Sequence, residues 1–257
     1  LERGGGDARI ARTAAEGMAE ILFGTAGTLY RQGDAQISLV FAYLALRLRP
    51  DFPIAHFLVA DLQNSLGRYQ DAVETYRRIP PDAALDWAAR LRVATGLAEL
   101  DQIDAAIEEL EELAAERTDQ HDPLFRVGNL LRGQERFAEA VGAYDRAVSR
   151  IPTLADEHWP LLYARGIALE RSQQWSRAEA DLLRALELRP EHPYVLNYLG
   201  YSWADQGKNL DEALDMIERA VRQRPTDGFI VDSLGWVYYR IGDFEKAVNY
   251  LERAVEL

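Results

Sequence analysis

Residues 228–257 have the sequence GFIVDSLGWVYYRIGDFEKAVNYLERAVEL, and this stretch decides the fold. Four apolar residues in its first half follow the spacing i, i+3, i+4 and i+7, which places side chains on one face of an α-helix: Leu234, Val237, Tyr238 and Ile241. Gly242 interrupts the pattern, and a second apolar stripe runs from Ala247 to Val255. The stretch therefore predicts two antiparallel helices joined by a short turn.

Small residues recur through the chain at the length of this unit. One series consists of Ala26, Ala60, Ala94, Gly128, Gly166, Gly200 and Gly235. A second series consists of Ser38, Ala72, Ala106, Ala140, Ala178, Ala213 and Ala247. Most intervals in both series are 34 residues, and both share one interval of 38 residues at the same place. The matching series indicate seven internal repeats, which we assign to residues 19–52, 53–86, 87–120, 121–154, 159–192, 193–227 and 228–257.

A 34-residue helix–turn–helix unit with a small residue at its eighth place, alanine at its twentieth and proline near its end resembles the tetratricopeptide repeat. The resemblance covers nearly the whole chain. It implies an all-α, right-handed superhelical solenoid of about seven units, in which glycine or alanine lets the two helices of a hairpin approach closely. We expect about fourteen helices and no β-sheet, with hairpin turns near Gly33, Gly67, Asp101, Gly133, Gln173, Gly207 and Gly242.

Two places depart from the regular pattern. Pro80 and Pro81 are expected to end the second helix of the second repeat near Ile79, about one turn early. Residues 155–158 are a four-residue insertion. This insertion is either a longer connecting loop or a change of superhelical direction that divides the array into halves.

The expected organisation follows from these assignments. Residues 1–18 form a mobile N-terminal segment and the start of the first helix, which a capping box from Thr13 to Glu16 opens. Repeats one to four occupy 19–154, the inserted loop 155–158, and repeats five to seven 159–257, the last one truncated. The chain begins without Met or a signal peptide and ends without a polar capping helix, so we interpret it as processed or as part of a longer protein.

Composition excludes several classes of protein. A net charge of −13 disfavours nucleic-acid binding, because an acidic chain repels phosphate backbones. The absence of cysteine excludes disulfides, thiolate metal sites and cysteine nucleophiles, and it fits either the cytosol or an oxidising compartment. The longest apolar run, residues 37–48, is shorter than the roughly 20 residues of a membrane span. Two lysines against 27 arginines suggest a bacterial genome rich in GC.

No motif predicts catalysis, a metal or a cofactor. His56, His121, His158 and His192 lie in different repeats without paired-ligand spacing, and we interpret them as surface or helix-start residues. Phosphate-binding glycine loops and nucleophile elbows are absent. The acidic run from Glu108 to Glu112 is interpreted as a solvated helix face. We therefore expect a non-enzymatic protein.

The resemblance implies that the second, fifth, ninth and twelfth places of each first helix point into a concave groove. In the last three repeats these places bring together our candidate partner-binding residues: Tyr163, Tyr194, Asn197, Tyr201, Phe229, Asp232, Trp236 and Tyr239. The buried places of the same helices are already held by Leu199, Trp203, Leu234 and Tyr238. The groove aromatics are thus surplus to the core, and exposed aromatics are what binding sites use. Alternatively, a truncation exposes them, or a neighbouring helix covers them in a longer protein.

These features favour a non-catalytic scaffold that binds another protein through a peptide or a partner helix, and an apolar segment with some positive charge suits the groove. The alternatives are a substrate-recognition arm of a larger enzyme, such as a glycosyltransferase, and a glycan-binding envelope protein. Residues 196–201 and 231–236 resemble multi-repeat proteins of alphaproteobacteria, several of which look exported, which favours the envelope over the cytoplasm. Leu251, Ala254 and Val255 face no further repeat, so we also expect self-association through this end.

Overall fold

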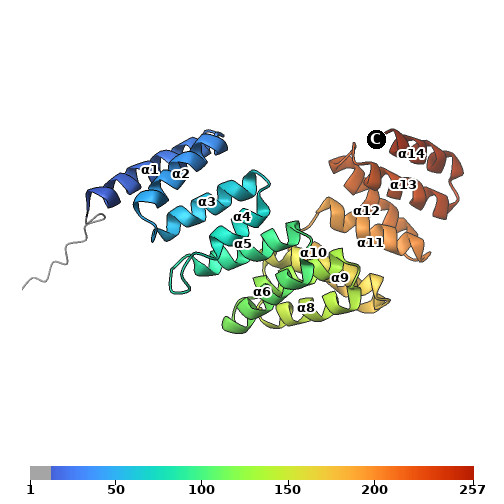
Figure 1. Ribbon diagram of the computed structural model, residues 1–257. Coiled ribbons are helices and arrows are strands. Elements are labelled where there is room, and N and C mark those ends of the chain that lie inside the picture. The colour runs from blue at the N-terminus through green and yellow to red at the C-terminus, as the bar shows by residue number, and fades with distance from the viewer. Residues whose placement is uncertain (1–12) are drawn as a thin grey trace, which may run out of the picture. The chain divides into compact units, whose positions relative to one another are not determined.

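The computed structural model describes residues 13–257, and over that range it contains helices and no strand (Figure 1). Six helices precede residue 120: α1 (Ala14–Arg31), α2 (Ala35–Leu48), α3 (Pro53–Ser65), α4 (Tyr69–Tyr76), α5 (Asp86–Glu99) and α6 (Ile103–Glu116). Eight follow: α7 (Asp122–Gly133), α8 (Phe137–Ser149), α9 (Trp159–Arg171), α10 (Trp175–Leu188), α11 (Pro193–Asp205), α12 (Leu210–Gln223), α13 (Gly228–Ile241) and α14 (Phe244–Glu256). The prediction of an all-α fold with about fourteen helices is confirmed.

The start of the first helix matches its sequence signal. The Thr13 side chain accepts a hydrogen bond from the backbone N–H of Glu16 at 3.1 Å, and α1 begins at Ala14. Thr13 therefore caps one of the N–H groups that a helix start leaves without a partner. Of the segment expected to be mobile, residues 1–12 lie outside the described part of the chain.

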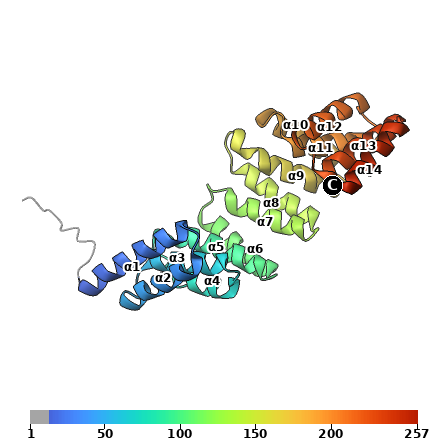
Figure 2. The ribbon, with the colours of Figure 1, turned by 90° about the horizontal axis from the view of Figure 1, so that it is seen from above.

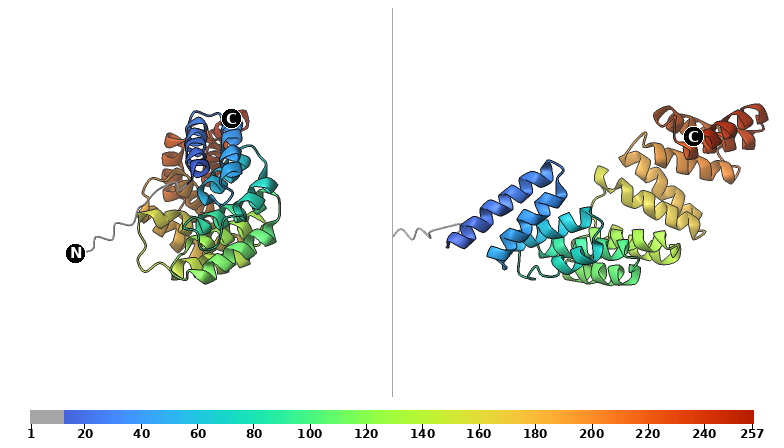
Figure 3. Two further views of the ribbon diagram at one scale, coloured as in Figure 1. Left: turned by 60° about the vertical axis from the view of Figure 1, so that its left-hand side comes forward. Right: turned by 45° about the horizontal axis from the view of Figure 1, so that its top comes forward.

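The helices belong to two compact units, one reaching Leu130 and one comprising Leu131–Leu257. The first unit contains the hairpins α1/α2, α3/α4 and α5/α6, and the second contains α8 and the hairpins α9/α10, α11/α12 and α13/α14 (Figures 2 and 3). The boundary between the two units falls within α7. Residues 155–158 include a short 3₁₀ turn, Asp156–His158, in which the Ala155 N–H donates to Nδ1 of His158 at 2.9 Å.

Each pair of helices from α1/α2 to α13/α14 is connected through a residue with a left-handed backbone. The seven residues are Gly33, Gly67, Asp101, Glu135, Gln173, Gly207 and Gly242. Six of them were predicted. The fourth turn was expected near Gly133, but α7 includes Gly133 and the chain reverses two residues later, at Glu135 (φ 56°). The position of the turn is thus set by the repeat register, and a non-glycine residue accepts the strained conformation there.

Helix α4 is shorter than the other second helices. Its start aligns with those of α2 and α6 at intervals of 34 residues, but it ends at Tyr76. The prediction of an end near Ile79 was therefore three residues too long. The N–H of Ile79 donates to the carbonyl of Tyr76 at 3.0 Å, so the chain tightens into a turn before Pro80 and Pro81.

Close backbone approach explains the glycines of the last three repeats. An added Cβ at Gly200 would lie 3.0 Å from the Ala213 carbonyl oxygen and 2.9 Å from Cγ1 of Ile217. At Gly235 the same atom would lie 2.7 Å from Cγ of Leu251. Helix pairs α11/α12 and α13/α14 therefore cross at a distance that only glycine permits.

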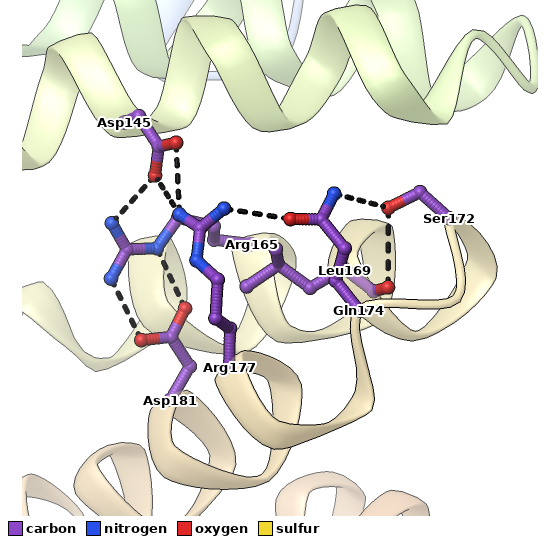
Figure 4. Close-up of polar contacts among 7 residues, drawn as sticks. All are labelled: Asp145, Arg165, Leu169, Ser172, Gln174, Arg177 and Asp181. Atoms are coloured by element: carbon purple, nitrogen blue, oxygen red, sulfur yellow. Dashed lines mark hydrogen bonds and ion pairs between the residues drawn. The ribbon is translucent and has the colours of Figure 1, made fainter.

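An ion-pair network joins α8, α9 and α10 within the second unit (Figure 4). The guanidinium of Arg165 donates from Nε and Nη2 to both carboxylate oxygens of Asp181, at 2.6 and 2.7 Å, and from Nη1 to Asp145 at 3.0 Å. Arg177 also donates to Asp145, at 2.7 Å. Burial acts to lower the pKa of Arg165, but the bonds to Asp181 and Asp145 outweigh it and raise that pKa. The network fixes the side-chain geometry where two repeats meet.

A second arginine corrects the interpretation of the acidic run. Arg90 on α5 forms ion pairs with Glu109 at 2.6 Å, with Glu112 at 2.9 Å and with Glu116. These three acids are spaced i, i+3 and i+7, so they share the face of α6 that points toward α5. The run is therefore only partly a solvated face.

Replacing two helical glycines should shift stability in opposite directions. Gly200→Ala should lower the free energy of unfolding by about 1–3 kcal/mol, because the new methyl group meets a backbone oxygen. Gly142→Ala on α8 should raise it by about 0.5–1 kcal/mol, since nothing lies within 4 Å of the added carbon. Urea unfolding followed by circular dichroism measures both, and a stabilised Gly200→Ala variant would contradict the close crossing.

Removal of the Arg165 guanidinium should destabilise the second unit. Arg165→Met leaves Asp181, whose side chain is 11% exposed, without its bidentate partner, and should lower the free energy of unfolding by about 2–4 kcal/mol. Arg184→Met is the matched control, because Arg184 pairs with Glu187 at the surface and should contribute less than about 1 kcal/mol. Equal losses in the two variants would refute a special role for the network.

Candidate functional site

The candidate residues lie on the first helices α9, α11 and α13 of the second unit. Four aromatic side chains among them are exposed: Tyr194, Tyr201, Phe229 and Tyr239. The four residues assigned to the core of these helices are all buried: Leu199, Trp203, Leu234 and Tyr238. The helical register predicted from sequence is therefore right for the core and for these four aromatics.

Two other aromatics of the set are not surplus to the core. Tyr163 and Trp236 are half-buried and pack against the main apolar cluster of the second unit. Burial raises the pKa of the Tyr163 hydroxyl. Ala204, which occupies the twelfth place of the sixth repeat, is fully buried in the same cluster. The spacing rule therefore predicts the correct helix face, but the large rings at the edge of that face pack partly against the core.

One aromatic cluster links the fifth and sixth repeats. The ring of Trp159 lies 4.0 Å from that of His192 and 6.3 Å from that of Tyr163, between centroids. Tyr163 in turn meets Tyr198 edge-on at 6.0 Å, and His192 lies 5.9 Å from Tyr194. Trp159, His192 and Tyr198 were missed, because they occupy helix starts and a place outside the four-position rule. Burial, then Arg189 and Arg224, lowers the pKa of His192, which favours the neutral form of its ring.

A second aromatic cluster lies on the last hairpin. The rings of Trp236 and Tyr239 stack with centroids 5.4 Å apart, and Tyr239 lies 5.7 Å from Phe244. The guanidinium carbon of Arg240 sits 5.7 Å from the centre of the Trp236 ring. Phe244 is exposed and was not predicted, since it begins the second helix of its hairpin. Three rings from two helices thus form one apolar surface.

Carboxylates surround Tyr201, which lies along α11 after Tyr194 and Asn197. Burial, followed by the negative charges of Asp205, Asp232 and Glu170, raises the pKa of the Tyr201 hydroxyl. Glu170 accepts a hydrogen bond from the Tyr198 hydroxyl at 2.9 Å, and Asp205 lies 3.8 Å from Arg240. This part of the face therefore combines aromatic rings with carboxylates.

Two polar atoms on this face have no hydrogen-bond partner within residues 13–257. They are Oδ1 of Asn197 and the Nε1–H of Trp236, both buried. One accepts and the other donates, as a peptide group requires.

Among the described residues no cluster of His, Cys, Asp or Glu is fit to hold a metal ion. None of the described helices is both long and apolar enough to span a bilayer.

The last candidate residues border a pocket of about 480 Å³ beside the final hairpin. Phe229 and Asp232 line it from α13, and Val255 and Leu257 line it from the end of the chain. Phe229 and Val255 are each 89% exposed. This pocket adds apolar surface next to the aromatic side chains of α13.

Three substitutions in α13 should separate core from surface. Leu234→Ala should lower the free energy of unfolding by about 2–5 kcal/mol, because it leaves a cavity in the buried stripe. Tyr239→Ala should change it by less than about 1 kcal/mol, since that ring is half exposed. Trp236→Ala should fall between them. Thermal unfolding of the three variants tests the order, and a Trp236→Ala loss as small as that of Tyr239→Ala would contradict the packing described.

The chain matches family models along most of its length. A model described as Tetratricopeptide repeat matches residues 42–86, 91–155 and 163–228, and another of the same description matches residues 232–257. TPR repeat-containing protein PA4667 of Pseudomonas aeruginosa is 28% identical over 203 residues, which cover 79% of this chain and 34% of that protein. Mitochondrial import receptor subunit TOM70 of Homo sapiens is 21% identical over 165 residues, 26% of its length. The chain thus spans about a third or less of these curated relatives.

Solved structures of repeat proteins share the fold. The C-terminal part of a TPR repeat-containing protein from Cytophaga hutchinsonii has a TM-score of 0.71 at 19% identity, over 91% of this chain and 95% of that one. A tetratricopeptide repeat protein from Parabacteroides merdae has a TM-score of 0.69 at 15% identity, over 93% of each chain. Fourteen helices within residues 13–257 and two matching series of small residues, together with these family matches, place the chain in the tetratricopeptide repeat family.

Proposed function

We propose that the chain is a non-catalytic scaffold that binds a peptide or a partner helix in the concave, aromatic-rich groove formed by α9, α11 and α13. Proteins of this family are generally scaffolds for protein–protein interaction. The observation that carries the proposal is the set of four exposed aromatic side chains on α11 and α13, at positions that the buried stripe does not need. Aromatic residues of this kind dominate the binding energy of interfaces.

The charge of the face supports a particular kind of partner. Asp232 is exposed on α13. After burial, the negative charges of Asp205, Asp232 and Glu170 raise the pKa of the Tyr201 hydroxyl. An apolar segment that also carries lysine or arginine would meet rings and carboxylates together.

Two other functions predict different ligands for the same rings. A glycan-binding envelope protein would stack sugars on Tyr194, Tyr201 and Tyr239, and a substrate-recognition arm of a larger enzyme would bind that enzyme's substrate. Titration with soluble peptidoglycan fragments distinguishes the two hypotheses, because only a glycan-binding protein should bind these fragments. The resemblance to alphaproteobacterial proteins stays a prediction.

Peptide selection followed by mutation tests the groove. Peptides selected from a random displayed library should be rich in apolar residues and in lysine or arginine. Tyr201→Ala should lower the affinity for the selected peptides by at least about tenfold, because an anchoring aromatic side chain contributes roughly 1–2 kcal/mol or more to binding. Leu183→Ala is the control, since Leu183 is equally exposed but lies on the second helix α10. Fluorescence anisotropy measures the affinities, and equal losses in both variants would refute the groove.

We also propose that the last hairpin mediates self-association, because Phe229, Val255 and Leu257 expose apolar surface around its pocket. Sedimentation velocity should show a concentration-dependent dimer, and Val255→Glu should shift it to monomer. A chain that stays monomeric at high concentration would contradict this contact.

A further inference from the structure

An apolar groove lies on the second helices of the first unit, remote in sequence from the aromatic face. It has a volume of about 590 Å³, and its lining residues come from α2, from α3 and from the end of α4. Val40, Tyr43 and Leu44 line it from α2, and His56 and Val59 line its floor from α3. We call this surface the α2 groove.

The apolar face of α2 is an exception among the second helices. Five of its side chains are 37–56% exposed: Ile37, Val40, Tyr43, Leu44 and Leu48. In the repeat register the position of Leu44 is charged in all six other second helices, as Arg78, Glu112, Arg146, Arg184, Arg219 and Arg253. The position of Ile37 is Asp, Ala, Glu, Arg, Glu and Lys in the same six. Packing of the repeats therefore does not require apolar residues at these positions. Helix α2 nevertheless has them, and it exposes apolar side chains to water, which is unfavourable.

The shortened helix α4 leaves room beside this face. Both α2 and α6 run for 14 residues, and the 34-residue register would extend α4 to residue 82, but α4 ends at Tyr76. Six missing residues correspond to between one and two turns, about 9 Å of helix. Thr75 and Arg78, at the point where α4 stops, line the groove. The space and the exposed apolar stripe thus occur at the same place.

Charge indicates what fills the space. Both charged residues that line the groove, Arg47 and Arg78, are arginines. Together with the adjacent exposed Arg77, they form no ion pair with any residue in the described range 13–257, although the chain as a whole has a net charge of −13. An occupant that supplies carboxylates beside an apolar stripe would complement this rim.

A second copy of the chain fits the groove poorly. A two-fold contact centred on the groove would place it against itself, so that the arginines of one copy would face those of the other. We propose that the α2 groove docks an amphipathic helix of another protein, one that carries an apolar stripe flanked by Asp or Glu. The helix packs along Val40 and Leu44 in the space beside the end of α4, and its acids pair with Arg47 and Arg78.

Designed helices test this proposal on the full chain. The probe is a fluorescein-labelled, stapled helix of about 14 residues, four turns, with leucines at i, i+3 and i+7 and glutamates beside them. A matched probe carries lysine in place of each glutamate. We expect the glutamate probe to bind at least about tenfold more tightly than the lysine probe in an anisotropy titration, with a difference that shrinks as salt is added. Equal affinities, or no saturable binding of either probe, would overturn the proposal.

Variants locate the binding site and reverse its preference. Leu44→Glu should weaken binding of the glutamate probe at least about tenfold. The melting temperature of this variant should stay unchanged, because Leu44 is exposed. Leu183→Glu, at the register position of Tyr43 in α10, should leave binding unchanged. The double variant Arg47→Glu, Arg78→Glu should prefer the lysine probe. Tyr201→Ala should have no effect, so failure here is distinct from failure of the aromatic face.

Two outcomes of these variants count against the proposal. Loss of binding in Leu183→Glu equal to that in Leu44→Glu would show that the probe binds apolar surface without selection. Sedimentation that shows a dimer of the chain, converted to monomer by Leu44→Glu, would make a second copy the occupant.

Discussion

The close approach of two helix backbones in each hairpin is the constraint on which the structure depends. At Gly166, Gly200 and Gly235 a methyl group would press on the leucine or isoleucine of the facing helix, at 2.7–3.0 Å. The larger residue on one helix fills the space that glycine leaves on the other, so the hairpin packs without a void. Every hairpin must cross at the same place along its helices for neighbouring hairpins to stack. The 34-residue interval follows from that requirement, and the turn falls where the interval puts it.

This constraint explains which parts of the fold could be predicted from the sequence. Small residues at fixed intervals identify the crossings, and the crossings fix the helices and the turns. The error at the fourth turn is instructive, because glycine was taken as the mark of the turn when the register marks it: Gly133 stays helical and Glu135 turns. The early end of α4 was foreseen from Pro80, but not its extent. A proline disfavours the helical conformation of the residue before it, here Ile79, and this does not account for Arg77 and Arg78, which also lie outside α4.

Side-chain partners across helices could not be predicted in the same way. Arg90 holds three glutamates of α6, and Arg165 joins three helices, yet each is one arginine among 27 in the sequence. Such pairs depend on the rotation of each helix about its axis, which a spacing rule gives only to within about one residue. The same uncertainty separates Tyr201, which is exposed, from Trp236, which is half-buried at the same place of the next repeat. The candidate site was therefore predicted as a face, and not ring by ring.

A repeat array offers a comparison that a single-core protein lacks, because each repeat shows what packing alone demands at every position. On the first helices this comparison leaves the exposed aromatics of α11 and α13 without a packing reason, and on the second helices it leaves the apolar stripe of α2 without one. The two surfaces differ in chemistry as well. Carboxylates lie beside the rings around Tyr201, whereas arginines line the α2 groove. They lie in different units and share no residue, so a partner on one surface does not use the contacts of the other. If both surfaces bind as proposed, the opposite charges beside them would select partners of opposite charge, because each surface attracts the charge that the other repels.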